Sequence, residues 1–372
     1  MLSTHRDVLS LGNADEFANG SLELSFYAGK SVFLTGHTGF KGGWLTAMLR
    51  HLGASIHGYA LVPETQSNLF GIADIQSFLS SHTLADLADS TAMLAAMRAA
   101  QPEIVFHLAA QPLVRRSYIE PALTWQTNVQ GTVNLLECVR QCPSVRAVVI
   151  ITTDKCYENQ EWHWGYREND HLGGHDPYSA SKAACELVVN SYRASFFNAS
   201  GVRIASARAG NVIGGGDWAA DRLIPDAVRA IAVGQMLQIR NPAASRPWQH
   251  VLAPLHGYLL LGKALLCGQA GVDSSFNFGP SQQDNLSVVN VLKRLQGHWP
   301  ELELALSTAG EQSHESQLLY LDSSKAQHVL GWQSRWNLAK SLEKTAGWYR
   351  AEHAGNECMQ RYTLDQIEEY FL

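Results

Sequence analysis

The chain has 372 residues, of which 46% are hydrophobic and 17% charged, and its formal net charge is −6 at pH 7. This composition is typical of a globular protein with a large core, and the negative charge argues against a general nucleic-acid-binding protein. No apolar run reaches the roughly 20 residues of a membrane span. None of the six cysteines forms a CxxC pair, and the first 25 residues lack the order of a signal peptide. We therefore expect reduced thiols, no metal centre and a cytoplasmic protein.

Strands and helices alternate from Lys30 onward, after a polar N-terminal extension at residues 1–25. The predicted strands are residues 31–35, 54–60, 103–108, 145–152 and 202–208, and the predicted helices include residues 91–100, 121–141 and 176–196. This alternation predicts an α/β fold with a Rossmann-type, doubly wound parallel sheet. We expect residues 26–209 to form that domain. Residues 210–372, where the regularity weakens, should form mainly a smaller lobe interleaved with it.

A glycine-rich turn, residues 36–42, follows the first strand and opens a helix. Glycines permit a tight turn and a close approach to a pyrophosphate, and the helix N-terminus supplies N–H donors. The GxxGxxG spacing is weak evidence alone, and a purely structural turn is the alternative. With this strand and helix around it, the segment predicts a dinucleotide site. The expected contacts are Gly36, Thr38, Gly39, Phe40 and Gly42.

The end of the second strand indicates which dinucleotide is bound. Tyr59-Ala60-Leu61 is uncharged, and Glu64 comes only after Pro63, beyond the expected end of the strand. No arginine follows Ala60 to hold a 2′-phosphate, so NAD is preferred over NADP. Asp86 and Leu87 follow the third strand and are candidate adenine contacts, although Asp86 is equally well explained as an ordinary loop aspartate.

Small residues end the fourth strand and leave room for a cofactor to cross the sheet edge. These are Ala109 and Ala110, followed by Gln111, and we expect all three to contact the cofactor. Asn128, in the predicted helix 121–141, is a further expected contact. We expect a packing role for His107 instead of a catalytic one.

Tyr178 and Lys182 lie four residues apart, so they project from one face of a helix. A phenol with a pKa near ~10 is a poor base at neutral pH. A nearby ammonium and a cationic nicotinamide lower that pKa, so that Tyr178 can take a proton from a hydroxyl. Thr153, at the end of the fifth strand, is placed to orient the same hydroxyl.

Four segments together carry a resemblance to a known family. They are residues 36–42, Thr153 to Asn159, Tyr178 to Lys182, and Gly210 to Trp218. From about residue 26 to residue 348 the chain resembles an extended short-chain dehydrogenase/reductase, and within that superfamily most closely the CDP-glucose 4,6-dehydratases. Residues 1–25 lie outside the family pattern.

The resemblance implies a three-step reaction of deoxysugar biosynthesis. NAD⁺ oxidises C4 of the sugar with Tyr178 as base, water is eliminated across C5 and C6, and the hydride returns to C6. Elimination needs an acid and a base, and the family pattern places Asp154 and Lys155 there. We assign Asp154 as acid and Lys155 as base, although Lys155 as an electrostatic clamp on the enolate stays an alternative. An Asp-Lys pair also occurs in UDP-N-acetylglucosamine dehydratases, so the pair does not identify the nucleotide.

The second lobe is expected to hold the sugar nucleotide. Guanidinium groups bind phosphate in a bidentate manner, and the candidates are Asn211, Arg222, Arg240 and Arg246. An NDP-sugar 4-epimerase of the same fold is the main alternative, but it has no use for an acid/base pair at C5 and C6. A non-catalytic dinucleotide-sensing regulator is a weaker alternative. Such a protein is free to lose Tyr178, Lys182 or Thr153, and this chain keeps all three. The superfamily resemblance also implies a homodimer, or a tetramer, through helices 121–141 and 176–196.

Overall fold

The computed structural model describes residues 25–239, 241–306, 318–355 and 358–372. Its centre is a seven-stranded parallel sheet with the strand order β11-β6-β5-β4-β1-β2-β3. The strands are β1 (Ser31–Thr35), β2 (Ser55–Ala60), β3 (Ser81–Leu84), β4 (Ile104–His107), β5 (Ala147–Ile151), β6 (Arg203–Ala209) and β11 (Ser275–Phe278). The predicted Rossmann-type fold class is confirmed.

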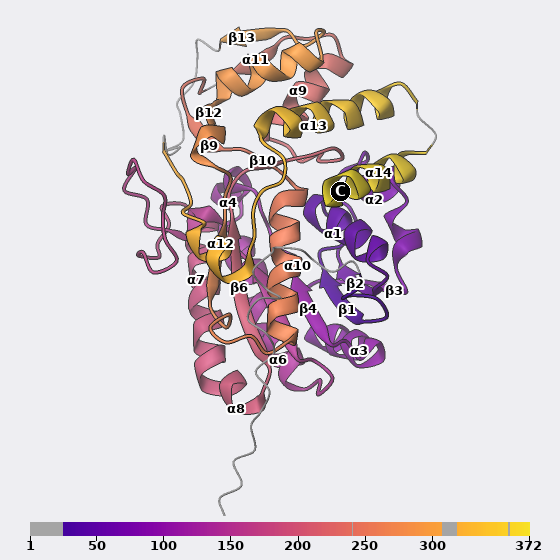
Figure 1. Ribbon diagram of the computed structural model, residues 1–372, viewed down its shortest axis with the longest axis vertical. Coiled ribbons are helices and arrows are strands. Elements are labelled where there is room, and N and C mark those ends of the chain that lie inside the picture. Colours follow the sequence, from indigo (N-terminus) through magenta and orange to yellow (C-terminus); the bar gives the residue numbers. More distant parts are fainter. Residues whose placement is uncertain (1–24, 240, 307–317, 356–357) are drawn as a thin grey trace, which may run out of the picture.

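Helices cover both faces of this sheet, so its central strands are buried on both sides (Figure 1). In β5, Val149 and Ile151 pack into the core on one face, while Val148 and Ile150 pack into the core on the other. The first face is covered by α1 (Phe40–His51) and α10 (Leu252–Leu266), and the second by α3 (Ser90–Ala100), α6 (Gly131–Arg140) and α7 (Pro177–Tyr192). This double burial explains why the strands read as continuous apolar runs.

Two long helical runs match the predicted ones, with π-helical turns inside or at the end of them. Residues 121–140 form α5 (Pro121–Trp125), a π-helical turn (Gln126–Gln130) and α6. Helix α7 begins at Pro177, with Asp176 as N-cap accepting a hydrogen bond from the Ser179 amide, and continues into a π-helical turn (Arg193–Phe197). A proline at the first helical position and an aspartate cap fix where α7 starts.

The chain after residue 210 builds a separate group of elements at one end of the sheet and also returns to it. Figure 1 shows α9, α11 and α13 together at the top of the molecule, whereas α10 runs down the sheet face. The group comprises α9 (Leu223–Ala232), α11 (Val288–His298), α13 (Leu338–His353) and the short strands β8 (Leu237–Ile239), β9 (Ser245–Pro247), β12 (Asn285–Ser287) and β13 (Leu304–Leu306). Helix α14 (Met359–Phe371) packs against α1. Strand β11 pairs with β6 and completes the sheet. No helix in these described ranges has the length and apolarity that a membrane crossing requires.

Candidate active site

The glycine turn between β1 and α1 is closed so tightly that side chains are excluded from it. Gly36 has φ +80°, and a Cβ there would lie 2.7 Å from the Ala109 amide nitrogen. A Cβ on Gly42 would lie 2.0 Å from the Gly36 carbonyl oxygen. Gly39 is the N-cap of α1 and offers no side-chain cap, so the first amides of the helix face outward toward an anion. The turn therefore fits the pyrophosphate of a dinucleotide.

The loop after β4 is held against the sheet and α7 by buried polar side chains. The Asn128 amide oxygen accepts from the Gln111 N–H at 2.8 Å, and its nitrogen donates to Ser181 at 2.9 Å. These contacts engage the Asn128 side chain, so it shapes the loop that contains Ala109 and Ala110. His107 is buried between Thr35 at 2.7 Å and Thr132 at 3.3 Å, as a packing role predicts.

The adenine side has no carboxylate at the end of β2. This strand ends at Ala60, and Glu64 forms an ion pair with Arg116 at 2.6 Å, away from the strand end. Asp86 is exposed after β3, where its carboxylate accepts from the Ala88 N–H at 2.8 Å, while Leu87 is buried. Thr38 donates to the Leu61 carbonyl at 2.8 Å and ties the glycine turn to the chain that follows β2.

Tyr178, Lys182 and Thr153 come together at the end of β5, as predicted. The Lys182 ammonium donates to the Ile151 carbonyl at 3.1 Å, and Thr153 forms a hydrogen bond with Tyr178. Burial raises the pKa of Tyr178 to about 12, although that hydrogen bond and the charge of Arg222 oppose the rise. Burial also lowers the pKa of Lys182. In the protein alone Tyr178 is thus a neutral phenol, and the expected lowering of its pKa needs the positive charge of a cofactor.

Asp154 is the most unusual group of the site. It lies in a short 3-10 turn, Asp154–Cys156, and is 2% exposed. Its Oδ1 accepts from Thr153 at 2.9 Å, whereas its Oδ2 is buried without a hydrogen-bond partner. Burial raises the pKa of this carboxyl against the opposing charge of Lys155. A Cβ on Gly210 would lie 2.9 Å from Oδ2, so the glycine keeps space open beside it. Such a carboxyl is suited to carry and release a proton.

Lys41 also lies close to this site, although it was not among the residues expected from the sequence. Burial, reinforced by the charge of Arg222, lowers the pKa of Lys41 to about 8, and the carboxylate of Asp154 opposes this shift. Lys41 follows Phe40 at the start of α1, so the helix that begins at the glycine turn also brings this side chain toward Asp154. A polar residue within an apolar first helical turn was the only signal in the sequence.

Two of the four predicted substrate-binding residues, Arg222 and Arg246, lie near the catalytic candidates. Arg222 pairs with Asp217 at 3.2 Å and acts electrostatically on Tyr178. Arg246, in β9, is buried and its charge reaches Asp154. The backbone carbonyl of Asn211 accepts from the Gln249 N–H at 3.3 Å, while Arg240 lies outside the described residues.

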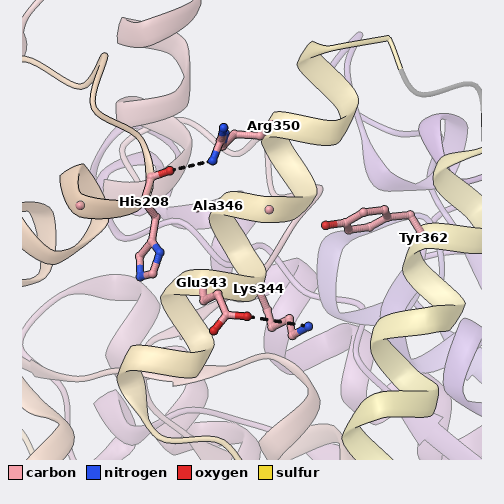
Figure 2. A pocket seen from close by; sticks show the side chains of 8 residues that line it. His298, Glu343, Lys344, Ala346, Arg350 and Tyr362 are labelled. Carbon is pink, nitrogen blue, oxygen red and sulfur yellow. Dashed lines mark hydrogen bonds and ion pairs between the residues drawn. The ribbon is translucent and has the colours of Figure 1, made fainter.

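A second concave region lies between α11, α13 and α14, and none of the predicted site residues lines it (Figure 2). Its cationic side chains already have partners: Arg350 donates to the His298 carbonyl at 3.2 Å, and Lys344 pairs with Glu343 and Glu369. We therefore place the chemistry at the end of β5.

Comparisons with known proteins agree with the family resemblance that the sequence indicated. The family model described as GDP-mannose 4,6 dehydratase matches residues 33–345. A CDP-glucose 4,6-dehydratase of Salmonella typhimurium (strain LT2) is 46% identical over 354 residues, 93% of this chain and 98% of that protein. This relative confirms the resemblance expected from the sequence.

Two solved structures share the fold at low identity. A UDP-glucose-4-epimerase from Stenotrophomonas maltophila has a TM-score of 0.74 at 21% identity and covers 87% of this chain and 99% of its own. A double mutant of the dTDP-glucose 4,6-dehydratase DesIV from Streptomyces venezuelae has a TM-score of 0.73 at 23% identity and covers 88% and 99%. The family model spans most of the sheet and the second lobe, and the Salmonella relative covers 93% of this chain. The chain belongs to the GDP-mannose 4,6 dehydratase family.

Proposed function

We propose that this protein is an NAD-dependent CDP-glucose 4,6-dehydratase, a hydro-lyase that forms CDP-4-keto-6-deoxyglucose and water. The observation that carries this proposal is the buried carboxyl of Asp154, with one unpartnered oxygen, beside Thr153 and Tyr178. The Salmonella relative, named a CDP-glucose 4,6-dehydratase, supports the choice of nucleotide.

NAD, when bound, supplies a hydride acceptor for C4 and a donor for C6. The glycine turn is placed to hold its pyrophosphate at the N-terminus of α1, and Ala109 and Ala110 leave room at the end of β4. The lack of a carboxylate at the end of β2 leaves ribose recognition to the loops after β2 and β3, where Asp86 and Leu87 are the proposed adenine contacts.

The oxidation at C4 assigns one role to each of three residues. Tyr178 takes the proton of the C4 hydroxyl, and Thr153 holds that hydroxyl through the hydrogen-bonding position it shares with Tyr178. Lys182, anchored on the Ile151 carbonyl, supplies the positive charge that stabilises the phenolate.

The elimination uses the two residues that follow Thr153. The ketone formed at C4 acidifies the C5–H bond, and Lys155 takes that proton. Asp154 donates its proton to the C6 hydroxyl, which leaves as water when the C6–O bond breaks. The raised pKa of Asp154 favours the protonated form that this step requires.

The sugar nucleotide is assigned to the surface between β6 and the second lobe. Arg222 and Arg246 are proposed to bind the diphosphate, since both lie close enough to act on the catalytic groups. Asn211 and Arg240 remain proposed contacts of the same ligand.

We also propose a homodimer, or a tetramer, formed through the two long helical runs. Large apolar side chains are exposed on both: Leu123 and Trp125 in α5, and Leu187 in α7 at 61% exposure. Pairing of these faces between two copies would bury them. A cytoplasmic location fits the absence of disulfides, because all six cysteines, which lie in the described ranges, are thiols.

The experiment that tests the function gives the purified protein CDP-, dTDP-, UDP- and GDP-glucose separately, with mass spectrometry of the products. We expect CDP-glucose to lose one water, and Tyr178→Phe to abolish the reaction. Water loss from another nucleotide sugar alone would correct the nucleotide. C4 epimers without water loss would identify an epimerase and overturn the proposal.

A further inference from the structure

A buried ion pair lies next to the turn that carries Asp154 and Lys155, and neither of its residues is among those proposed to bind the cofactor or the substrate. It joins Glu186 of α7 to Arg208 of β6 at 2.8 Å, and both side chains are almost wholly buried. Burial alone would raise the pKa of Glu186, but the charge and hydrogen bonds of Arg208 hold it below its usual range. The carboxylate is therefore ionised at neutral pH.

The pair binds the catalytic turn at both of its ends. Thr152, immediately before Thr153, donates its hydroxyl to Glu186 at 2.5 Å. Tyr157, immediately after the Asp154–Cys156 turn, receives a hydrogen bond from Arg208 at 2.7 Å. The four residues between these anchors include Asp154 and Lys155, so the position of both depends on the two contacts.

The same pair also fixes the helix on the other side of the site. Glu186 is one helical turn beyond Lys182, on the same face of α7. Ser206 of β6 donates to Glu186 at 2.6 Å, and Ser275 of β11 does so at 3.0 Å. The carboxylate thus ties α7 to three adjacent strands of the sheet.

Stability alone is a weak reason for such a pair. Desolvation of two charges costs several kcal/mol, and well-packed apolar residues often stabilise a core at least as well. A charged group with many directed hydrogen bonds does what apolar residues cannot, since it fixes several segments in one relative geometry.

We propose that the Glu186–Arg208 pair is a positioning device that holds the turn carrying Thr153, Asp154 and Lys155 in register with Tyr178 and Lys182 on α7. This inference rests on the proposed function for its catalytic meaning. Neither residue of the pair is itself a catalytic residue.

Removal of the pair would endanger folding, so the test removes one hydroxyl at a time. Thr152→Val deletes the hydrogen bond that reaches Glu186 from the catalytic strand. Ser275→Ala is the control. It deletes a hydroxyl that donates to Glu186 and accepts from Arg208, but this hydroxyl comes from β11, which carries no catalytic group. Thr152→Ser restores the hydroxyl as a rescue.

We expect Thr152→Val to lower kcat about tenfold or more with little change in KM, because small misplacements of catalytic groups are costly. Ser275→Ala should stay within about twofold of the wild type at a similar thermal midpoint, and Thr152→Ser should recover most of kcat. Wild-type kcat in a folded Thr152→Val variant, or equal losses in both variants, would overturn the proposal.

Hydrogen–deuterium exchange of the peptide spanning residues 147–157 separates this inference from the proposed function. Thr152→Val should speed exchange there and Ser275→Ala should not, whichever substrate the enzyme uses. If the wild type dehydrates no nucleotide sugar, the proposed function fails while this readout still decides the positioning role. Equal exchange in both variants would overturn that role.

Discussion

Two carboxyl groups of this protein lie close in the fold and are almost equally buried, yet their surroundings are opposite. Glu186 accepts hydrogen bonds from Thr152, Ser206, Ser275 and Arg208. The charge of Arg208, with the hydrogen bonds from Arg208, Ser206 and Thr152, holds the pKa of Glu186 below the usual range against the effect of burial. Asp154 has one hydrogen-bonded oxygen and one without a partner, and burial raises its pKa. Burial by itself therefore does not determine what a carboxyl does. Satisfied oxygens make Glu186 a structural anchor, and an unsatisfied one makes Asp154 available for chemistry.

Asp154→Asn is the substitution with the largest expected effect on turnover. An amide cannot donate an acidic proton, so we expect kcat for dehydration to fall about 10²–10⁴-fold. A carboxyl whose pKa is raised on folding destabilises the protein above its unfolded pKa, so the neutral amide should leave the thermal midpoint at pH 7 unchanged or higher. A lowered thermal midpoint with normal turnover would show that Asp154 is a structural group, as we propose for Glu186, and not a catalytic one.

Lys155→Ala tests whether Lys155 is the base that removes the C5 proton. Oxidation at C4 should persist because Tyr178, Thr153 and Lys182 are intact, while the C5 proton is no longer removed. Reduced nicotinamide should therefore accumulate in single-turnover absorbance measurements without a dehydrated product. Normal dehydration by this variant would leave the base role to Asp154 or a water molecule.

Glu186→Gln should have the opposite signature to Asp154→Asn. It leaves the buried Arg208 guanidinium without its counter-charge, and breaking such a pair costs about 3–5 kcal/mol of folding free energy. Urea denaturation measures this loss. A variant as stable as the wild type would show that Arg208 is compensated elsewhere, against the role we give the pair.

His256→Phe tests the cost of a third kind of buried group, a neutral one. Both ring nitrogens of His256 lack partners, and burial lowers the pKa of this side chain to about 3. Because the unfolded chain binds the proton near pH 6.5, stability should be lost as the pH falls below that value toward 3. The free energy that the variant gains over the wild type should be about 2 kcal/mol larger at pH 5 than at pH 8. Thermal unfolding at the two pH values compares them, and an equal effect at both would exclude titration of His256.

Local patterns in the sequence predicted much of this arrangement. Examples are the alternation of strands and helices, the glycine turn, and the four-residue spacing of Tyr178 and Lys182. Each depends only on residues that are near one another in the sequence, so it can be recognised without knowledge of the fold.

Through-space contacts were not predictable in this way. Lys41 and Asp154 are far apart in sequence, as are Glu186 and Arg208 on separate elements, and only the assembled sheet brings them together. The space beside the unpartnered Oδ2 of Asp154 likewise depends on Gly210, which is far from it in sequence. Sequence named Asp154 as a candidate but gave no sign of which of its oxygens is left for a ligand.

The most direct test of the account follows a deuterium label from C4 of CDP-glucose. The account predicts that the wild type converts CDP-[4-²H]glucose into a product that has lost water and carries the deuterium at C6, and that Asp154→Asn forms no such product. Retention of the label at C4 in a product that has not lost water, or unchanged transfer to C6 by Asp154→Asn, would contradict it.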